Sequence, residues 1–213
     1  DVDLQAHQSI IDAVDIETPT NPDSADVVVT GPDDSRPRID ILGNNISLTS
    51  LFGSIGLSGN ELDIDSSHHT AGALTTSIYL NTYIIEPLND LRLGQISTRV
   101  DNPTGELYTA FITASMGRIL NGNSGGKNVK SGKTYLFANG DIGEDGNAIS
   151  TEVGNIEGKS TTGSTWIMND GALTVGGVVD SSDPGMFAGG KVTIGASSPV
   201  TLTKSITAAE IVV

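Results

Sequence analysis

The chain contains no cysteine, which excludes disulfide bonds, zinc sites with thiolate ligands and cysteine nucleophiles. Aromatic residues make up only 4% of its 213 residues, so a core would have to be built from Ile, Val, Leu and Ala. No run of 18 apolar residues occurs, and no membrane-spanning segment is therefore expected.

Basic residues are also scarce. The chain has 11 Lys and Arg against 26 Asp and Glu, which gives a formal net charge of −15. Nucleic acids and anionic membranes are bound mainly through Lys and Arg, so neither nucleic-acid binding nor membrane insertion is expected. An acidic surface favours solubility and attracts cations, and the simplest interpretation of the charge is a solvated surface.

What the chain has instead is glycine, with 26 residues, and short segments in which apolar and polar residues alternate. Ile46 and Leu48 alternate with Ser47 and Thr49, and the pattern recurs in residues 171–179, 189–197, 199–207 and 209–213. Alternation with a period of two predicts β-strands, and Gly and Asn favour the turns between them. Residues 4–14 could form a short helix, but a strand is favoured there too.

Residues 53–60 and 140–147 share the pattern Gly-x-Ile-Gly-x-x-Gly-Asn, in the sequences "GSIGLSGN" and "GDIGEDGN". A looser copy lies at 111–125. The glycines are expected to turn the chain, the Ile to enter the core, and the Asn to occupy a corner. The predicted turn residues are Gly53, Gly56, Gly59, Asn60, Gly140, Gly143, Gly146 and Asn147.

Internal repeats of this kind predict a solenoid, here a parallel β-helix in which like residues stack on like residues of the next rung. At about 20 residues per rung, residues 1–213 are expected to form a single domain of about ten rungs. The 23-residue step from Gly117 to Gly140 would be one rung, and the 87-residue step from Gly53 to Gly140 about four. A β-sandwich is the alternative.

Polar segments rich in Pro, Gly or Asn interrupt the alternating pattern. They are expected to be loops inserted between strands of one domain rather than linkers between domains. The predicted inserted loops are residues 17–26, 31–38 and 121–133.

The second copy of the motif groups Asp141, Glu144 and Asp145 within five residues. Oxygen-rich turns can hold calcium, so these three residues are weak candidates for a calcium site. The sister turn at 53–60 has Ser or Leu at the same three places and cannot do the same. The motif is therefore interpreted as a turn, and no metal or cofactor is expected.

Two segments resemble catalytic or nucleotide-binding motifs but have the wrong spacing. His68 or His69, Asp101 and Ser124 follow the order of a serine-protease triad, yet only 55 residues separate His69 from Ser124. Residues 126–134 resemble a phosphate-binding loop, but five residues rather than four lie between the glycines.

Asp63 and Asp65 alternate with Leu62 and Ile64, which places both carboxylates on the outer face of one strand. Polysaccharide lyases and hydrolases with a β-helix fold work through such carboxylates. An ordinary polar outer face explains the pair more simply, and the chain is not expected to be an enzyme.

Four stretches resemble the repeat region of filamentous-haemagglutinin-like bacterial surface proteins: "ISLTSLFGSIGLSGNELDID", "TYLFANGDIGEDGNAISTEVGNIEG", "GALTVGGV" and "GGKVTIGASSPVTLTKSITA". The resemblance is good over about residues 38–60 and 107–213. It implies a right-handed parallel β-helix, secretion to the cell exterior, and service as a rod in a very large adhesin or surface fibre. The family's Asn-Pro-Asn secretion signature is missing, since residues 20–23 read "TNPD", so an interior segment is expected.

The sequence thus predicts a non-catalytic, extracellular structural or adhesive module of a bacterial surface or filament protein. Both ends read as uncapped strands, as in a segment of a longer rod or a subunit that stacks end to end. The expected partners are neighbouring repeats, further copies, and host or cell-surface glycans or proteins.

Two alternatives remain, a carbohydrate-active β-helix enzyme and a carbohydrate-binding β module. A groove that combined carboxylates with aromatic platforms would favour them. The large platforms are four Phe and the residues Trp166, Tyr79, Tyr83, Tyr108 and Tyr135.

Overall fold

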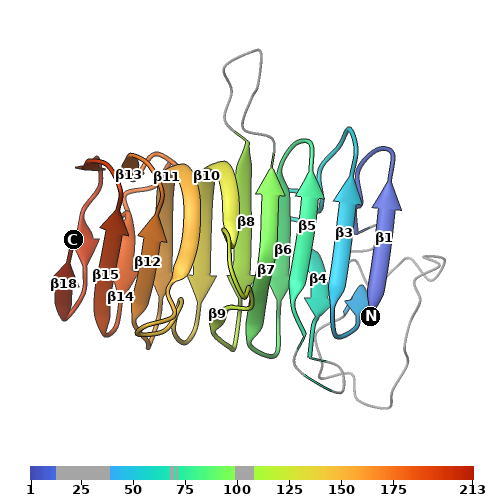
Figure 1. Cartoon of the computed structure of the whole chain (residues 1–213), viewed down its shortest axis with the longest axis horizontal. Helices are drawn as coiled ribbons and strands as arrows, with labels where there is room; N and C mark the ends of the chain where they lie inside the picture. The colour runs from blue at the N-terminus through green and yellow to red at the C-terminus, as the bar shows by residue number, and fades with distance from the viewer. Residues whose placement is uncertain (13–38, 68–69, 71, 99–107) are drawn as a thin grey trace.

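The computed structural model describes residues 1–12, 39–67, 70, 72–98 and 108–213. In this part of the chain, the backbone winds into a β-solenoid with its two ends at opposite ends of the coil (Figure 1). The strands that face each other in neighbouring coils are all parallel. The predicted parallel β-helix is confirmed at the level of a β-solenoid, and the β-sandwich is wrong.

The solenoid is flattened into two faces, which Figure 1 shows one behind the other. The first face contains β1 (Val2–Ala6), β3 (Ile46–Ser50), β5 (Leu74–Ile78), β7 (Leu91–Thr98), β9 (Ile119–Asn121), β12 (Thr165–Asn169), β15 (Lys191–Ala196) and β18 (Glu210–Val212). The second contains β2 (Ile41–Leu42), β4 (Leu62–Asp65), β6 (Thr82–Glu86), β8 (Thr109–Ala114), β13 (Leu173–Val175), β14 (Met186–Ala188), β16 (Val200–Leu202) and β17 (Ile206–Thr207). Two longer strands, β10 (Val129–Ala138) and β11 (Ile149–Ser160), pass from the first face to the second.

The core lies between the two faces and is built from aliphatic ladders. Alternate residues of each strand point inward, as in β3, where Ile46, Leu48 and Ser50 are buried. The buried apolar residues are Ile, Leu, Val, Ala and Met, without a single Phe, Tyr or Trp among the described residues. Each buried Ile or Leu contributes about 1.5 to 3 kcal/mol relative to an exposed one, which is enough to hold neighbouring coils together. The expected aliphatic core is confirmed.

The described strands make about six turns, so the expectation of ten rungs is not confirmed. The turns are longer than the assumed 20 residues. One ladder of the second face consists of Ile55, Thr82, Ala110, Thr134, Ile156 and Val175. Its successive members are 27, 28, 24, 22 and 19 residues apart, because several turns carry protruding segments.

Two other sequence predictions can be compared directly with the backbone. Residues 2–6 form a strand, so the alternative of a helix over 4–14 is wrong for that part. The step from Gly117 to Gly140 is one turn, as expected, because the Gly140 N–H donates to the Gly117 carbonyl at 2.9 Å. No helix in the described ranges is long and apolar enough to cross a membrane.

The predicted loop at 121–133 is too long. The chain leaves the first face after β9 and returns at Val129, which is buried and pairs with Ile96. Asn128 closes the excursion, since its buried amide nitrogen donates to the Leu93 carbonyl at 2.7 Å. Residues 129–133 are strand because Val129 and Ser131 face the core, a role that their polar, basic neighbours conceal. The predicted loops 17–26 and 31–38 lie outside the described residues.

Candidate functional site

Each copy of the repeated motif places an Ile in the core and then forms a small hairpin that protrudes from the face. Ile55 and Ile142 are fully buried. Leu57 and Asn60 exchange two backbone hydrogen bonds, at 2.9 and 3.1 Å. Glu144 and Asn147 do the same at 3.2 and 3.0 Å. The two copies therefore have the same local structure although their side chains differ.

The second glycine of each motif explains why the motif is written with glycine. Gly56 and Gly143 have φ of 64° and 72°, a region that residues with a side chain rarely adopt. A Cβ at Gly56 would overlap the carbonyl oxygen of Tyr83, and one at Gly143 would overlap that of Trp166. The following coil thus lies directly against these two glycines.

The other predicted turn residues have more varied surroundings. Gly59 and Gly146 have φ of 78° and 76° but face open space. The remaining four are Gly53, which packs against the backbone of Ser9, Gly140, which packs against the side chain of Arg118, Asn60, which donates to the Asp12 carbonyl at 2.8 Å, and Asn147, which is exposed.

The two copies lie on different faces of the solenoid. Ile55 starts the second face and pairs with Thr82, whereas Ile142 starts the first face and pairs with Ile119 and Thr165. Three turns lead from Ile55 to Thr134, and the chain then crosses to the first face before it reaches Ile142. The expectation that the 87 residues form about four whole turns is therefore wrong, because the lengths of the intervening turns are unequal.

The three calcium candidates are used separately. Asp141 accepts a hydrogen bond from the Ser164 N–H of the next coil at 2.7 Å, Glu144 pairs with Arg118 at 3.2 Å, and Asp145 is exposed. Within the described ranges, no three Asp, Glu or His side chains form a group that could hold a metal ion. The structure does not bring the three residues together as ligands.

Arg118 instead ties three coils together. Its guanidinium lies 2.7 Å from a carboxylate oxygen of Asp90 and 3.2 Å from one of Glu144. Partial burial raises the pKa of Asp90, but the hydrogen bonds and charge of Arg118 outweigh it and lower the pKa below its usual value. These groups act along the axis of the solenoid, as contacts between successive coils.

The other candidates from the sequence are not assembled into a site either. Asp63 and Asp65 lie on the outer side of β4, as expected, and Asp65 accepts hydrogen bonds from the Ser67 N–H and hydroxyl at 2.8 and 2.7 Å. Ser124 is exposed in the excursion after β9. Its proposed triad partners, His68 or His69 and Asp101, lie outside the described residues. The phosphate-loop candidate at 126–134 runs into β10.

Aromatic side chains gather on the outer side of the second face. Tyr83, Phe111 and Tyr135 stack on one another in three successive coils, with ring centroids 4.9 and 5.9 Å apart. In the neighbouring column, the Lys159 ammonium lies between the rings of Phe137 and Phe187, at 6.0 and 5.9 Å from their centroids. These five residues are most of the four Phe and four Tyr of the chain. We call them the aromatic face.

The geometry of the rings limits what the aromatic face can bind. Tyr83 and Phe111 are nearly parallel, with an interplanar angle of 9°, so each covers a flat side of the other. A sugar ring packs its C–H groups against a free aromatic face, and this stacked pair presents mostly edges. The remaining platforms lie elsewhere, since Trp166 is on the outer side of the first face and Tyr79 stacks with Phe52 at 5.8 Å. Tyr108 is half-buried just before β8.

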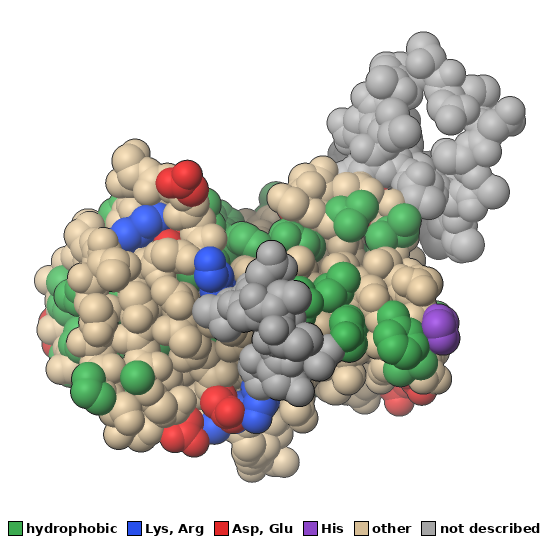
Figure 2. Space-filling model, turned by 90° about the horizontal axis from the view of Figure 1, so that it is seen from above, with side chains coloured by type: hydrophobic (Ala, Val, Ile, Leu, Met, Phe, Trp, Pro, Cys, Tyr) green, Lys and Arg blue, Asp and Glu red, His purple; other side chains and the backbone are tan. Residues whose placement is uncertain are grey.

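A smaller apolar patch lies at the corner that follows β1, β3 and β5. His7 and Phe52 are 4.8 Å apart, and Phe52 and Leu51 are 52% and 42% exposed. Figure 2 shows hydrophobic side chains gathered beside a histidine at the end of the molecule that carries β1. The sequence gave no signal for this patch, because its members are 28 or more residues apart and meet only when the coils stack.

One end of the aromatic face is covered by residues 176–185, which we call the strap. Glu157 follows Tyr135 in the same outer column and is 2% exposed. It accepts hydrogen bonds from the Val178 and Val179 N–H groups at 2.9 and 3.3 Å, and it pairs with the Lys204 ammonium at 3.1 Å. Burial raises the pKa of Tyr135, and the charges of Asp183 and Glu157 act in the same direction. The strap is therefore held down by a buried ion pair.

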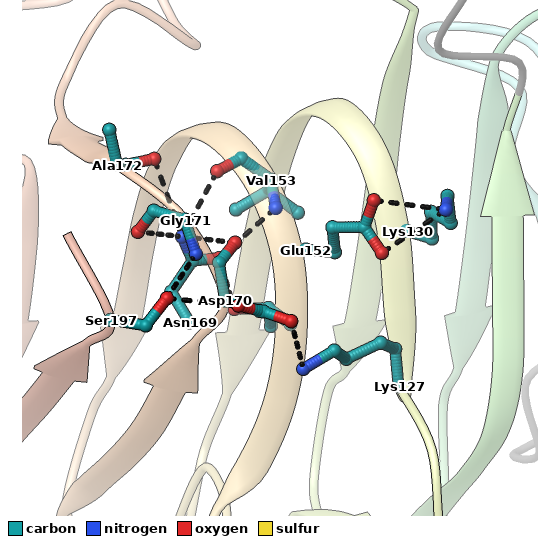
Figure 3. Close-up of polar contacts among 10 residues, drawn as sticks. Lys127, Lys130, Glu152, Val153, Asn169, Asp170, Gly171, Ala172 and Ser197 are labelled. Carbon is teal, nitrogen blue, oxygen red and sulfur yellow. Dashed lines mark hydrogen bonds and ion pairs between the residues drawn. The ribbon is translucent and has the colours of Figure 1, made fainter.

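Figure 3 shows a polar cluster at the corner where β12 ends. Asn169 accepts hydrogen bonds from the Thr151 hydroxyl at 2.8 Å and the Val153 N–H at 3.0 Å. Asp170 beside it accepts from the Ser197 hydroxyl at 2.9 Å and pairs with Lys127 at 3.2 Å, and both contacts lower its pKa. These oxygen atoms face protein donors from neighbouring coils, so the cluster joins coils as Arg118 does.

Glu86 differs from all the other acidic residues just described, because it faces the core. It ends β6 on the same side as Thr82 and Ile84 and is fully buried. The Ser66 N–H donates to its Oε2 at 2.9 Å, while Oε1 is buried without a hydrogen-bond partner. Burial raises its pKa to about 7 against the weaker effect of nearby backbone N–H groups. The alternation in "TYIIEP" contained the signal, since it places Glu86 on the side of Ile84.

Comparison of the chain with protein-family models, curated proteins and solved structures gave no match.

Proposed function

We propose that this chain is a non-catalytic structural or adhesive module of an extracellular bacterial surface or filament protein. The observation that carries the proposal is the use of its charged side chains. Arg118, Lys127, Lys130 and Lys204 each pair with a carboxylate from a neighbouring coil. Groups that an enzyme would direct at a substrate are here committed to holding coils together.

The edges of the solenoid supply the proposed contact with neighbours. The strands β1 and β18 are the outermost strands of the first face and carry partly exposed apolar side chains, with Leu4 40%, Ile211 47% and Val212 43% exposed. Open strand edges pair readily with other strands. The proposed partner is a neighbouring repeat of the same protein or a further copy of this chain.

Two measurements test the proposal. Electron micrographs of the purified protein are expected to show rods, either single or joined into fibres of uniform width. Incubation with a panel of acidic and neutral polysaccharides is expected to release no reducing ends and no unsaturated products. Reproducible cleavage that is lost on substitution of an outer-face carboxylate, such as Asp65→Asn, would overturn the proposal and establish the carbohydrate-active alternative.

A carbohydrate-binding module remains the second candidate, and the aromatic face is the observation that favours it. The stacking of Tyr83 on Phe111 speaks against it, so binding would depend on Tyr135, Phe137 and Phe187. Affinity electrophoresis in gels that contain a neutral glucan or mannan tests this candidate. Retardation of the wild-type chain that Phe137→Ala and Phe187→Ala abolish would support it, and equal mobility with and without glycan would eliminate it.

A further inference from the structure

A buried carboxyl group lies between two coils of the acidic half of the solenoid. Glu86 belongs to an inward column whose other members are small: Ala114, Ala138, Ser160 and Ala188. Where the later coils place a methyl or hydroxymethyl group, this coil places a carboxyl with no solvent contact. A charged carboxylate there would need compensation that a methyl-lined column does not give.

The contacts of Glu86 are one-sided. Ser66 supplies its N–H at 2.9 Å and its hydroxyl at 3.4 Å, both to Oε2, which links the end of β6 to the corner after β4. The charge that acts on Glu86 from the described residues is Asp65, which has the same sign. The charged or titratable groups on the elements around it are Glu61, Asp63, Asp65, Asp90 and, on β6 itself, Tyr83. Asp90 is already paired with Arg118.

We propose that Glu86 is a pH-sensitive joint, protonated and closed in mildly acidic solution, whose ionisation above neutral pH loosens the contact between the coils of β4 and β6. The neutral acid keeps its bond to Ser66 without a buried charge. The carboxylate can gain solvation only if the corner at Ser66 opens and admits water. This inference is independent of the proposed function, because it concerns only the stability of the coils.

The direction of the effect follows from linkage. The pKa of Glu86 rises from 4.5 in the unfolded chain to about 7 in the folded one, so the folded state holds an extra proton between these values. Stability from this group is complete below pH 4.5, falls as the pH rises, and is lost above pH 7. The opening equilibrium of the joint should increase by up to roughly 300-fold across this range, since each pKa unit is tenfold.

Hydrogen–deuterium exchange of the whole chain tests the joint, with rates corrected for intrinsic chemical exchange at each pH. Between about pH 5 and pH 8, amides in β4 and β6 of the wild type should lose protection by on the order of 100-fold, as expected for local opening of a repeat structure. Glu86→Gln should make their protection independent of pH. Glu152→Gln is the matched control, because Glu152 lies on the surface in an ion pair with Lys130, and it should keep the wild-type pH dependence.

Two results would overturn the proposal. One is identical exchange profiles in the wild type and Glu86→Gln. The other comes from the wild type alone, so it does not depend on the folding of a variant: carbon-13 NMR of the Glu side-chain carboxyls should show one that titrates near pH 7. If every resolved Glu titrates between about pH 3.5 and 5, Glu86 is not held neutral and the joint does not exist.

Discussion

The two halves of the solenoid carry very different charge. Residues 1–90 contain 15 of the 26 acidic residues but only Arg36 and Arg38 of the 11 basic ones, and residues 91–213 contain the other nine basic residues. The described ion pairs follow this division, since all of them lie from Asp90 onward. The earlier coils hold Glu86 in the core, whereas the later coils hold Ala or Ser at the same place in the column.

The comparison shows that one fold can be held together in two ways. Both halves share aliphatic ladders and parallel backbone pairing. The later half adds charged contacts along the axis, with Arg118, Lys130 and Lys204 each joining one coil to another. In a solenoid, stability is the sum of contacts between neighbouring repeats, so the halves can differ in stability without differing in shape. We expect the later half to be the more stable.

Breaking the strap contact should have the largest effect. Lys204→Met leaves Glu157 buried without its cation and should cost about 3 kcal/mol, because an unpaired buried charge is expensive. Urea unfolding measures this cost, and hydrogen exchange should show the amides of Val178 and Val179 exposed. The double variant Glu157→Gln/Lys204→Met removes both charges and should recover most of the loss. A single variant as stable as the wild type would show that the pair contributes nothing.

Substituting the motif glycines should come next. Gly143→Ala combines a positive φ with overlap on the Trp166 carbonyl and should cost about 2 to 4 kcal/mol in urea unfolding. Gly146→Ala, in the same hairpin, has a positive φ but open space, and should cost only about 1 kcal/mol. Equal costs would mean that the close approach of the next coil is unimportant. The pair Gly56→Ala and Gly59→Ala repeats the comparison in the acidic half.

Removing Arg118 should have a smaller effect that depends on pH. Arg118 and Asp90 are partly exposed, so Arg118→Ala should cost about 1 kcal/mol or less at pH 7. The folded pKa of Asp90 is lowered, so the stability from this pair is present above the unfolded value near 3.8 and is lost as the pH falls below it. Thermal unfolding of variant and wild type should therefore converge toward pH 2 to 3. A constant difference at all pH values would contradict the role of Asp90.

Salt should have the smallest effect and should sharpen the contrast between the halves. Raising NaCl from about 0.05 to 0.5 M screens like charges in the acidic half, and should increase amide protection in β3 to β6 by a few fold. The same change should leave protection in β11 to β15 equal or slightly reduced, because ion pairs there are screened. A uniform response along the chain would show that the charge difference has no energetic consequence.

Much of the fold could be predicted from local sequence. Alternation in β3, β4 and β15 placed Ile46, Leu62 and Ile194 inside, and all three are buried. The register between coils could not be predicted in the same way. It depends on the lengths of protruding segments, and the excursion after β9 makes its turn longer without changing the pattern of the strands on either side. This is why the two motif copies were expected to stack a whole number of turns apart but lie on different faces.

The candidate sites were less accessible from sequence than the fold. Tyr83 and Tyr135 were recognised as large side chains, but their stacking through Phe111 requires the pairing of β6, β8 and β10. Asp141 and Glu144 were recognised as neighbours in sequence, but Ser164 and Arg118 take them in different directions. Contacts between coils join residues about 20 to 28 positions apart, and no local pattern records them.

The sequence by itself determined that the chain forms short strands with an aliphatic inner side, and that glycines turn it, because alternation and positive φ are properties of single residues and their nearest neighbours. Only the tertiary structure decided which coil lies over which, and therefore that Glu86 is sealed between small side chains while Glu157 is sealed under the strap. The physical reason is that burial of a carboxyl depends on what the next coil places above it, and that is set by the register of the whole solenoid.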